Sequence, residues 1–335
     1  MATALESRRI VIAGASSLLG AELKSLLEES RFAASDFRLV DEESLAGLLT
    51  EAGGEPAVIQ PVEEDSFKKA WIIFFTGSAA FTKRNLELAK RSGARIVDLS
   101  GELAGLADVQ SWLPSLQLSP ASTSPPPAGP FSIPSAPAEI IIRIASALAP
   151  LKIIALTAVA FQPVSSSGGK AGVQELESQT GQLLSFQSVG KQVFDAQVAF
   201  TMLDRFGAVS HHKLQLFLEI LRRQMRAFIP KDATMPAVQL LHAPVYYGTT
   251  VSAYAFLDTA IAAAEIIKLC EAVGFSITGE ELPPSNVSSS GEILLQLAAP
   301  QPDAGSPCAW WFWAAADNLR LPASNAVKLA EKLLE

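Results

Sequence analysis

The sequence predicts an α/β protein of two domains, an N-terminal doubly wound parallel sheet followed by an α+β domain. Its 335 residues exceed the length at which a single hydrophobic core normally stops growing. The N-terminal part alternates short apolar runs with segments of helical periodicity, as βαβ units do. Hydrophobic residues make up 49% of the chain and charged residues 18%, a composition that favours compact, well-buried units.

Four apolar runs are expected to be parallel strands that are covered on both faces. They span residues 10–13, 37–40, 72–75 and 96–99. Leucines recur at helical spacing from Leu19 to Leu27, which indicates a helix after the first strand. A second helix is expected from Thr82 to Ser92, and Gly93 occupies the position where helices commonly end.

A proline-rich segment separates the two halves. Eight of the 21 prolines lie between Pro114 and Pro137, and three of them are consecutive from Pro125. This composition is typical of a linker or surface loop, so we interpret the segment as the domain boundary.

The second half mixes the two kinds of periodicity and contains no internal repeat. Helices are expected at residues 138–148, 173–186, 213–228, 259–273 and 325–334. Strands are expected at residues 152–160, 251–256, 293–297 and 310–316, and a Ser/Gly turn at 165–169. This order predicts an α+β domain.

Charge and composition argue against several classes of partner. The formal net charge is −8, whereas nucleic-acid binding relies on a basic surface. The most apolar stretch, Ile140 to Phe161, contains Arg143, Pro150 and Lys152, so we expect no membrane span. The two cysteines cannot form a disulfide framework, and the first residues lack the apolar core of a signal peptide. We therefore expect a cytoplasmic protein.

A metal site is not expected. His211 and His212 are adjacent, so they cannot both face one ion from a helix, and no carboxylate or cysteine partner is suitably spaced.

A glycine-spaced turn lies between the first strand and the first helix. Gly14 can adopt a backbone conformation that other residues resist, and Gly20 lets the helix pack close to the sheet. The N–H groups at the helix start would then face a pyrophosphate. The candidate cofactor-binding residues are Gly14, Ser16, Ser17, Leu18, Leu19 and Gly20. Ser17 replaces a middle glycine and narrows the site; the alternative is a turn that no longer binds a nucleotide.

Two acids follow the second strand. Asp41 and Glu42 come about 20 residues after Gly20, where an acid typically accepts hydrogen bonds from the adenosine ribose and repels a 2′-phosphate. If a cofactor binds, this position favours NAD over NADP. The alternative is that the acids only begin a solvated helix.

The C-terminal string from Ala316 to Val327, which reads ADNLRLPASNAV, resembles the closing motif of the aspartate-semialdehyde dehydrogenase family. Other family motifs are matched in order along the chain by residues 14–20, 75–78, 97–100, 169–176 and 243–248. The resemblance implies a Rossmann-like first domain of residues 1–136, completed by the helix 318–335. It also implies a second domain of residues 137–317 that forms a homodimer through a mixed sheet. Thr76, Gly77 and Asn325 would line the cofactor.

The resemblance also implies a well-defined chemistry. In the family, a cysteine thiolate attacks the aldehyde, hydride passes to the nicotinamide, and phosphate releases the acyl group. The nucleophile's position here falls at Glu139 or Ala138, and neither residue can form a thioester. The base position falls at Thr249, and the substrate-arginine position at His242. Gln162 could match the family glutamine that orients the acyl group. Ala104 replaces the arginine with which the family binds phosphate.

This set of replacements resembles the Usg-type branch of the family, which keeps the fold without the usual catalytic groups. Three functions stay open. The chain could be a dimeric family member that binds NAD without the family reaction. It could be an NAD(P)-dependent oxidoreductase that transfers hydride directly, with Glu139 or His242 as acid–base group. It could also be a structural or interaction protein without a cofactor, so whether it is an enzyme is left undecided.

Overall fold

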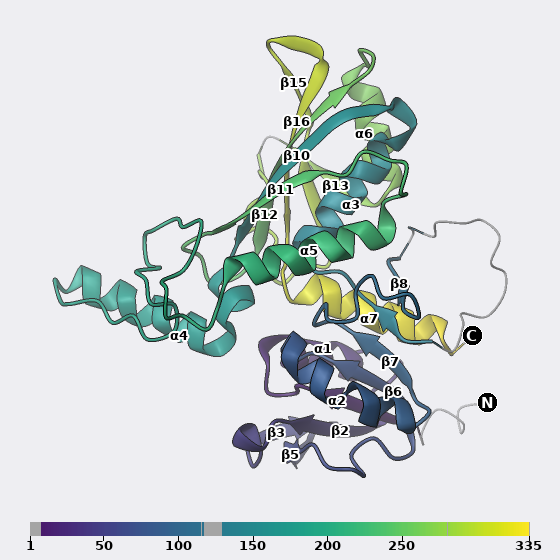
Figure 1. The fold of residues 1–335 in the computed structure, drawn as a ribbon, viewed down its shortest axis with the longest axis vertical. Helices are drawn as coiled ribbons and strands as arrows, with labels where there is room; N and C mark the ends of the chain where they lie inside the picture. Colours follow the sequence, from purple (N-terminus) through teal and green to yellow (C-terminus); the bar gives the residue numbers. More distant parts are fainter. Residues whose placement is uncertain (1–7, 115, 117–128, 280, 335) are drawn as a thin grey trace. The chain divides into compact units, whose positions relative to one another are not determined.

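The computed structural model divides into two compact units (Figure 1). Unit 1 comprises residues 1–134 and 322–335, and unit 2 comprises residues 135–321. The structure describes residues 8–114, 116, 129–279 and 281–334. The centre of the proline-rich segment that we interpret as a boundary lies outside the described residues.

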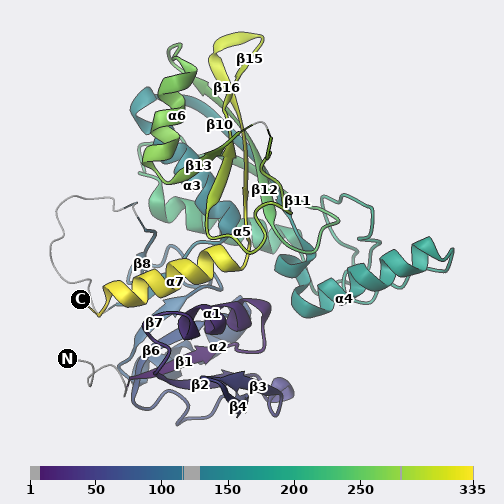
Figure 2. The same ribbon diagram turned by 180° about the vertical axis from the view of Figure 1, so that it is seen from behind.

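Unit 1 is built on a parallel sheet of seven strands in the order β5-β2-β1-β6-β7-β9-β8 (Figure 2). The strands are β1 (Arg9–Ala13), β2 (Asp36–Asp41), β5 (Gln60–Pro61), β6 (Ala70–Phe75), β7 (Arg95–Asp98), β8 (Gln110–Ser111) and β9 (Phe131–Ser132). β1 pairs in parallel with β2 on one side and with β6 on the other, so the chain winds outward from β1 in both directions. The predicted doubly wound sheet is confirmed.

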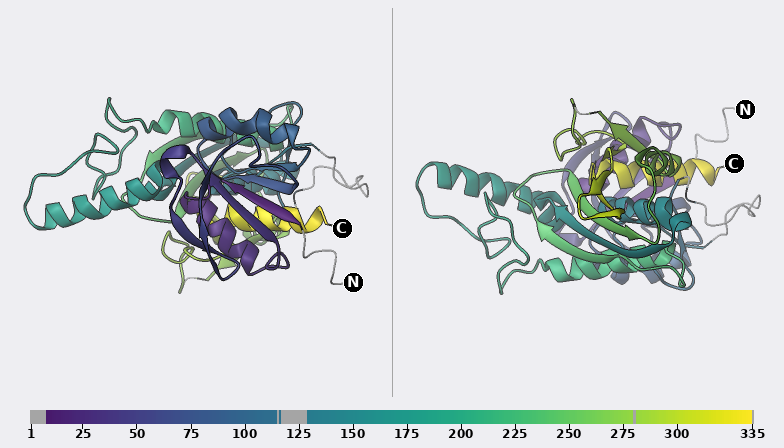
Figure 3. Two further views of the ribbon diagram at one scale, coloured as in Figure 1. Left: turned by 90° about the horizontal axis from the view of Figure 1, so that it is seen from below. Right: turned by 90° about the horizontal axis from the view of Figure 1, so that it is seen from above.

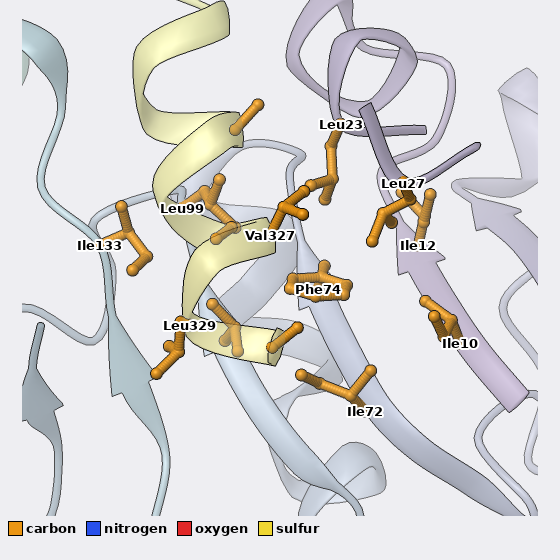
Figure 4. Close-up of a cluster of buried hydrophobic side chains, with 14 of the residues drawn as sticks. Ile10, Ile12, Leu23, Leu27, Ile72, Phe74, Leu99, Ile133, Val327 and Leu329 are labelled. Carbon is orange, nitrogen blue, oxygen red and sulfur yellow. The ribbon is translucent and has the colours of Figure 1, made fainter. Parts of the chain in front are cut away.

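Helices cover both faces of this sheet because its strand residues alternate between them. Ile10 and Ile12 pack with α1 (Leu18–Glu28) and with the C-terminal part of α7 (Arg320–Lys332). Val11 and Ala13 pack on the opposite face with α2 (Ala79–Arg91). Figure 4 shows Val327 of α7 beside Leu23 and Leu27 of α1, while Leu329 points to the side of α7 where Ile133 lies. Each such side chain contributes roughly 1.5–3 kcal/mol on full burial, which fixes the helix that ends the chain on this sheet.

Several short elements of unit 1 were not predicted. They are the hairpin β3 (Leu49–Ala52) and β4 (Glu55–Val58), the strands β5, β8 and β9, and the 3₁₀ helix η1 (Glu43–Leu45). These strands have two to four residues, too few to show a period in the sequence.

Unit 2 contains a mixed sheet in the order β11-β10-β12-β16-β14-β13, with β15 paired to β16. The strands are β10 (Ile153–Gln162), β11 (Ala237–His242), β12 (Thr249–Leu257), β13 (Phe275–Thr278), β14 (Leu295–Ala298), β15 (Gln301–Asp303) and β16 (Ser306–Ala316). The helices are α3 (Ala136–Leu148), η2 (Ala149–Leu151), α4 (Val164–Leu184), α5 (Leu214–Phe228) and α6 (Ala263–Ala272). β10 pairs with β11 in parallel and with β12 antiparallel, so the expected mixed sheet is confirmed.

Two local predictions in unit 2 were wrong. The expected Ser/Gly turn at 165–169 is part of α4, which starts at Val164 and is interrupted at Gly169 (φ 55°). Gly168 is needed for packing, because a Cβ there would lie 2.6 Å from the Phe194 ring, whereas Gly169 supplies the non-helical backbone conformation at the interruption. The helix expected from residue 259 begins at Ala263. α4 projects away from the sheet of unit 2 in both views of Figure 3.

Within the described ranges, no helix has both the length and the apolarity needed to span a bilayer. No group of three or more His, Cys, Asp or Glu side chains suited to a metal ion occurs among those same residues.

Candidate cofactor and active-site residues

The glycine turn of unit 1 packs directly against the loop that follows β6. Gly14 has φ 94°, and a Cβ there would overlap the backbone of Gly77. A Cβ on Gly20 would lie 2.5 Å from the Gly14 carbonyl oxygen and 2.9 Å from Thr76 Oγ1. Glycine is therefore required at both positions because neighbouring backbone lies too close for a Cβ, as is typical of a dinucleotide-binding turn.

Ser17 caps the helix that follows the turn. Its Oγ accepts from the Gly20 N–H at 2.9 Å and donates to the Thr76 carbonyl at 3.0 Å. The serine therefore occupies one N–H donor of the first helical turn, that of Gly20. This adds to the narrowing of the phosphate site that we expect from its Cβ. The N–H groups of Leu18 and Leu19 have no acceptor within the helix and point along the positive end of its dipole. These two donors remain for a phosphate.

Asp41 links the end of β2 to the glycine turn. Its side chain is buried; Oδ2 accepts from the Ser16 N–H and Oδ1 from the Glu42 N–H, each at 2.8 Å. Asp41 is therefore not part of a solvated helix start. Glu42 does fit the alternative of a solvated helix start. Its side chain is 41% exposed, and the residue directly precedes the 3₁₀ helix that begins at Glu43.

Of the remaining predicted cofactor residues in unit 1, Thr76 and Asn325 are buried and Gly77 is partly buried. Thr76 Oγ1 donates to the Gly14 carbonyl at 3.0 Å, which joins the two loops beside Gly77. Asn325 lies on α7 and is 1% exposed. The structure thus brings the turn, Asp41 and the Thr76 loop together at the carboxyl edge of the parallel sheet, where ligands of doubly wound folds bind.

In unit 2, the position predicted for the nucleophile is occupied by a buried ion pair. Glu139 and Arg143 are one helical turn apart near the start of α3, and are 0% and 4% exposed. Arg143 Nε and Nη2 lie 2.8 and 2.7 Å from Glu139 Oε1, and Nη1 donates to the Val273 carbonyl. Ala138 is fully buried beside them. The carboxylate is therefore held by an internal guanidinium.

Three other predicted positions meet at one edge of the mixed sheet. Gln162 ends β10 and is paired with His242 at the end of β11, while Thr249 begins the antiparallel β12. Gln162 Nε2 donates to Ser167 Oγ at 3.1 Å. Thr249 Oγ1 donates to the Phe161 carbonyl at 3.0 Å. Both side chains are bound within the unit, and the threonine hydroxyl is engaged as a donor.

His242 lies in an aromatic cluster. It is fully buried, its Nε2 is 3.2 Å from the Val198 carbonyl, and its ring centroid is 5.6 Å from that of Phe206 and 6.3 Å from that of Phe194. Burial lowers the pKa of His242, and the Val198 hydrogen bond offsets only part of this effect. The neutral ring is favoured, so His242 does not reproduce the fixed positive charge of an arginine.

Asn318 at this edge has a structural role that was not predicted from the sequence. Its Oδ1 accepts from the Gly248 N–H at 2.7 Å, and its Nδ2 donates to Ser165 Oγ and Ser166 Oγ at 3.0 and 2.9 Å. The neighbouring Asp317 accepts from the N–H groups of Gly291, Leu319 and Arg320. The closing motif itself was the available signal, because a buried Asp-Asn pair must find several partners.

One face of the mixed sheet exposes large side chains. Alternation along β16 buries Trp310 and exposes Trp311 (46%) and Trp313 (38%). Tyr254 on β12 lies 4.9 Å from Trp311 between ring centroids, and the two line a hollow with Thr157 and Ser252. Exposed aromatic side chains gathered on one sheet face are typical of a protein interface.

Known proteins match over nearly the whole chain. The profile "Semialdehyde dehydrogenase, NAD binding domain" matches residues 9–121, and "Semialdehyde dehydrogenase, dimerisation domain" matches residues 145–321. The "USG-1 protein homolog" of Azotobacter vinelandii is 28% identical, and that of Pseudomonas aeruginosa 26%, each over 97% of both chains. A solved "probable aspartate-semialdehyde dehydrogenase from Pseudomonas aeruginosa" superposes with a TM-score of 0.86 at 25% identity, covering 98% of this chain and 99% of the other. The expected resemblance to the family and to its Usg-type branch is confirmed.

Proposed function

The chain belongs to the semialdehyde dehydrogenase family, and we propose that it is a homodimer that binds a nicotinamide dinucleotide without performing the thiol-dependent family reaction. One observation carries this proposal: at the nucleophile's position, Glu139 is fully buried and its Oε1 is bound by Arg143 at 2.7–2.8 Å. A carboxylate cannot form the thioester that the reaction passes through.

The side chains at the other active positions support the same proposal. A base needs a free lone pair and a pKa near the working pH. Thr249 supplies neither, because an alcohol is not basic near neutral pH and its hydroxyl already donates to the Phe161 carbonyl. A substrate carboxylate needs a cation, whereas the buried His242 favours its neutral form.

Unit 1 fits a dinucleotide. Leu18 and Leu19 would supply N–H groups to the pyrophosphate, and the glycine approach at Gly14 and Gly77 leaves no Cβ in the way. The negative charges of Asp41 and Glu42 favour NAD over NADP at the ribose end. When bound, the dinucleotide supplies a nicotinamide ring that can accept or donate hydride.

The exposed aromatic face of unit 2 supports the homodimer. Trp311, Trp313 and Tyr254 lie on a sheet face within the segment that matches the family's dimerisation domain. A second copy would remove these rings from water, and burying an aromatic side chain is strongly favourable. Equilibrium sedimentation tests this assembly. Trp311→Lys should shift the equilibrium from dimer toward monomer. Trp310 is buried within its own chain and not on the exposed face, so it is left unchanged. A wild-type monomer at micromolar concentration would refute the homodimer.

A hydride-transferring oxidoreductase of changed mechanism is less well supported. It would need Glu139 or His242 as an acid–base group, and both are fully buried and bound by their own unit. A structural protein without a cofactor would not need the close approach of the turn to Gly77.

Two measurements on the full chain test the proposal. A spectrophotometric assay of phosphate-dependent aspartate-semialdehyde oxidation with NAD or NADP should give no turnover above a heat-denatured control. Titration with each dinucleotide by calorimetry should give saturable binding. Clear turnover would overturn the proposed loss of the family reaction, and failure to bind either dinucleotide would overturn cofactor binding.

A further inference from the structure

We propose that Arg84 and Glu42 together set the choice between NAD and NADP, with Arg84 giving the site affinity for the 2′-phosphate that the neighbouring acids oppose. This inference rests on the dinucleotide binding proposed above. It adds to that proposal a basic residue that lies outside the glycine motif and about 40 residues beyond the acids in the sequence.

The geometry places a guanidinium at the ribose end of the turn. Arg84 lies on α2, the helix that follows β6, and its Nη2 is 2.5 Å from Glu42 Oε1 at the end of β2. The two strands flank β1 on opposite sides, so the pair spans the carboxyl edge above the strand that carries the turn. The side chains of Arg84 and Glu42 are 58% and 41% exposed, so the ion pair faces water.

The two acids have different freedom to respond to a ligand. Asp41 is buried and both of its oxygens accept backbone N–H groups, so its position is fixed. Glu42 is held by Arg84, and an exposed pair of this kind contributes little to stability because water screens it. A ligand phosphate can therefore compete with Glu42 for the guanidinium at small cost.

NADP and NAD differ in the group that they present to Arg84, so their affinities should change differently when Arg84 or Glu42 is substituted. A 2′-phosphate carries close to two negative charges, and an arginine binds it through paired, charge-assisted hydrogen bonds. The free 2′-hydroxyl of NAD gains no such bond. Removal of Arg84 leaves Asp41 and Glu42 to repel the phosphate, whereas removal of the Glu42 charge frees Arg84 to bind it. Opposite shifts in NADP affinity are expected from the two substitutions.

The test compares dissociation constants for NAD and NADP by calorimetry in the full chain and three variants. Arg84→Ala should weaken NADP about 10-fold and NAD by about 2-fold or less, and Glu42→Gln should strengthen NADP about 10-fold; 10-fold corresponds to about 1.4 kcal/mol. Lys83→Ala is the matched control, because it removes an exposed charge from the same helix at the adjacent position. It should leave the ratio of the two constants within about 2-fold of wild type.

The outcomes separate this inference from the function on which it rests. Equal shifts for both dinucleotides, or no shift on Arg84→Ala, would overturn the role of Arg84 while leaving cofactor binding intact. If the wild-type chain binds neither dinucleotide, the proposed cofactor site and the specificity pair both fail. Circular dichroism of each variant should match the wild type, because both side chains are exposed.

Discussion

Placing a thiol at residue 139, the position that we propose for the family nucleophile, should destabilise the protein without creating the family activity. Glu139→Cys removes the Oε1 that two nitrogens of the Arg143 guanidinium, Nη2 and Nε, contact at 2.7 and 2.8 Å. Hydrogen bonds to charged groups contribute about 1.5–3 kcal/mol each, and breaking a buried ion pair costs about 3–5 kcal/mol. We therefore expect the free energy of unfolding to fall by about 3–5 kcal/mol.

Urea titration followed by tryptophan fluorescence measures this change. A Trp71→Phe, Trp112→Phe background leaves Trp310, Trp311 and Trp313, so the signal reports unit 2.

Two variants complete this experiment. Glu139→Cys with Arg143→Met should recover most of the loss, because an apolar replacement of a buried pair is often neutral. Glu177→Cys, at an exposed helical glutamate, should change stability by less than about 0.5 kcal/mol. If Glu139→Cys stays within about 1 kcal/mol of wild type, the ion pair does not stabilise unit 2 as argued. Phosphate-dependent turnover by the single variant would show that the site tolerates a working thiol.

Three further predictions concern the turn, the buried histidine and the Asn318 contacts. Gly14→Ala should abolish dinucleotide binding in calorimetry, because its Cβ would overlap Gly77 and its φ of 94° is strained for alanine; unchanged affinity would refute the close approach. The pKa of His242 is lowered below its ordinary value of 6.5, so protonation favours the unfolded chain and stability should fall as the pH drops below about 6.5. Thermal melts at pH 7.5 and 5.5, on the order of one unit either side of that value, measure this effect. The melting temperature should fall less between the two pH values in His242→Gln than in the wild type, whereas His211→Gln should show the full wild-type fall. Asn318→Ala should lower the unfolding free energy by about 2–4 kcal/mol, from three lost hydrogen bonds, and a change under about 1 kcal/mol would contradict that count.

The parallel sheet could be predicted from the sequence because its strands are short apolar runs between amphipathic helices. β1 and β6 extend the predicted runs by one or two residues at their starts, and α1 matches its leucine spacing. The start of α4 could not be predicted, because its serines and glycines are typical of a turn. Only the packing of Phe194 against Gly168 and Gly172 accounts for small residues in a helix.

The sequence indicated candidate positions for the site but not their contacts. Motif spacing singled out Glu139, Thr249 and Asp41 as candidates, yet hydrogen-bond partners depend on how distant segments meet. The Arg143 partner lies only four residues from Glu139 and could have been found from helical i,i+4 spacing. The Arg84–Glu42 pair spans different βα units, so no local pattern indicates it.

We propose that this chain keeps a dinucleotide site while the position predicted for the family thiol holds a carboxylate. Calorimetric titration of the full chain with NAD, in parallel with Gly14→Ala, tests it most directly. We expect saturable binding by the wild type with a dissociation constant below about 1 mM, equivalent to about −4 kcal/mol, and none by the variant. Absence of binding by the wild type, or equal binding by both proteins, would contradict it.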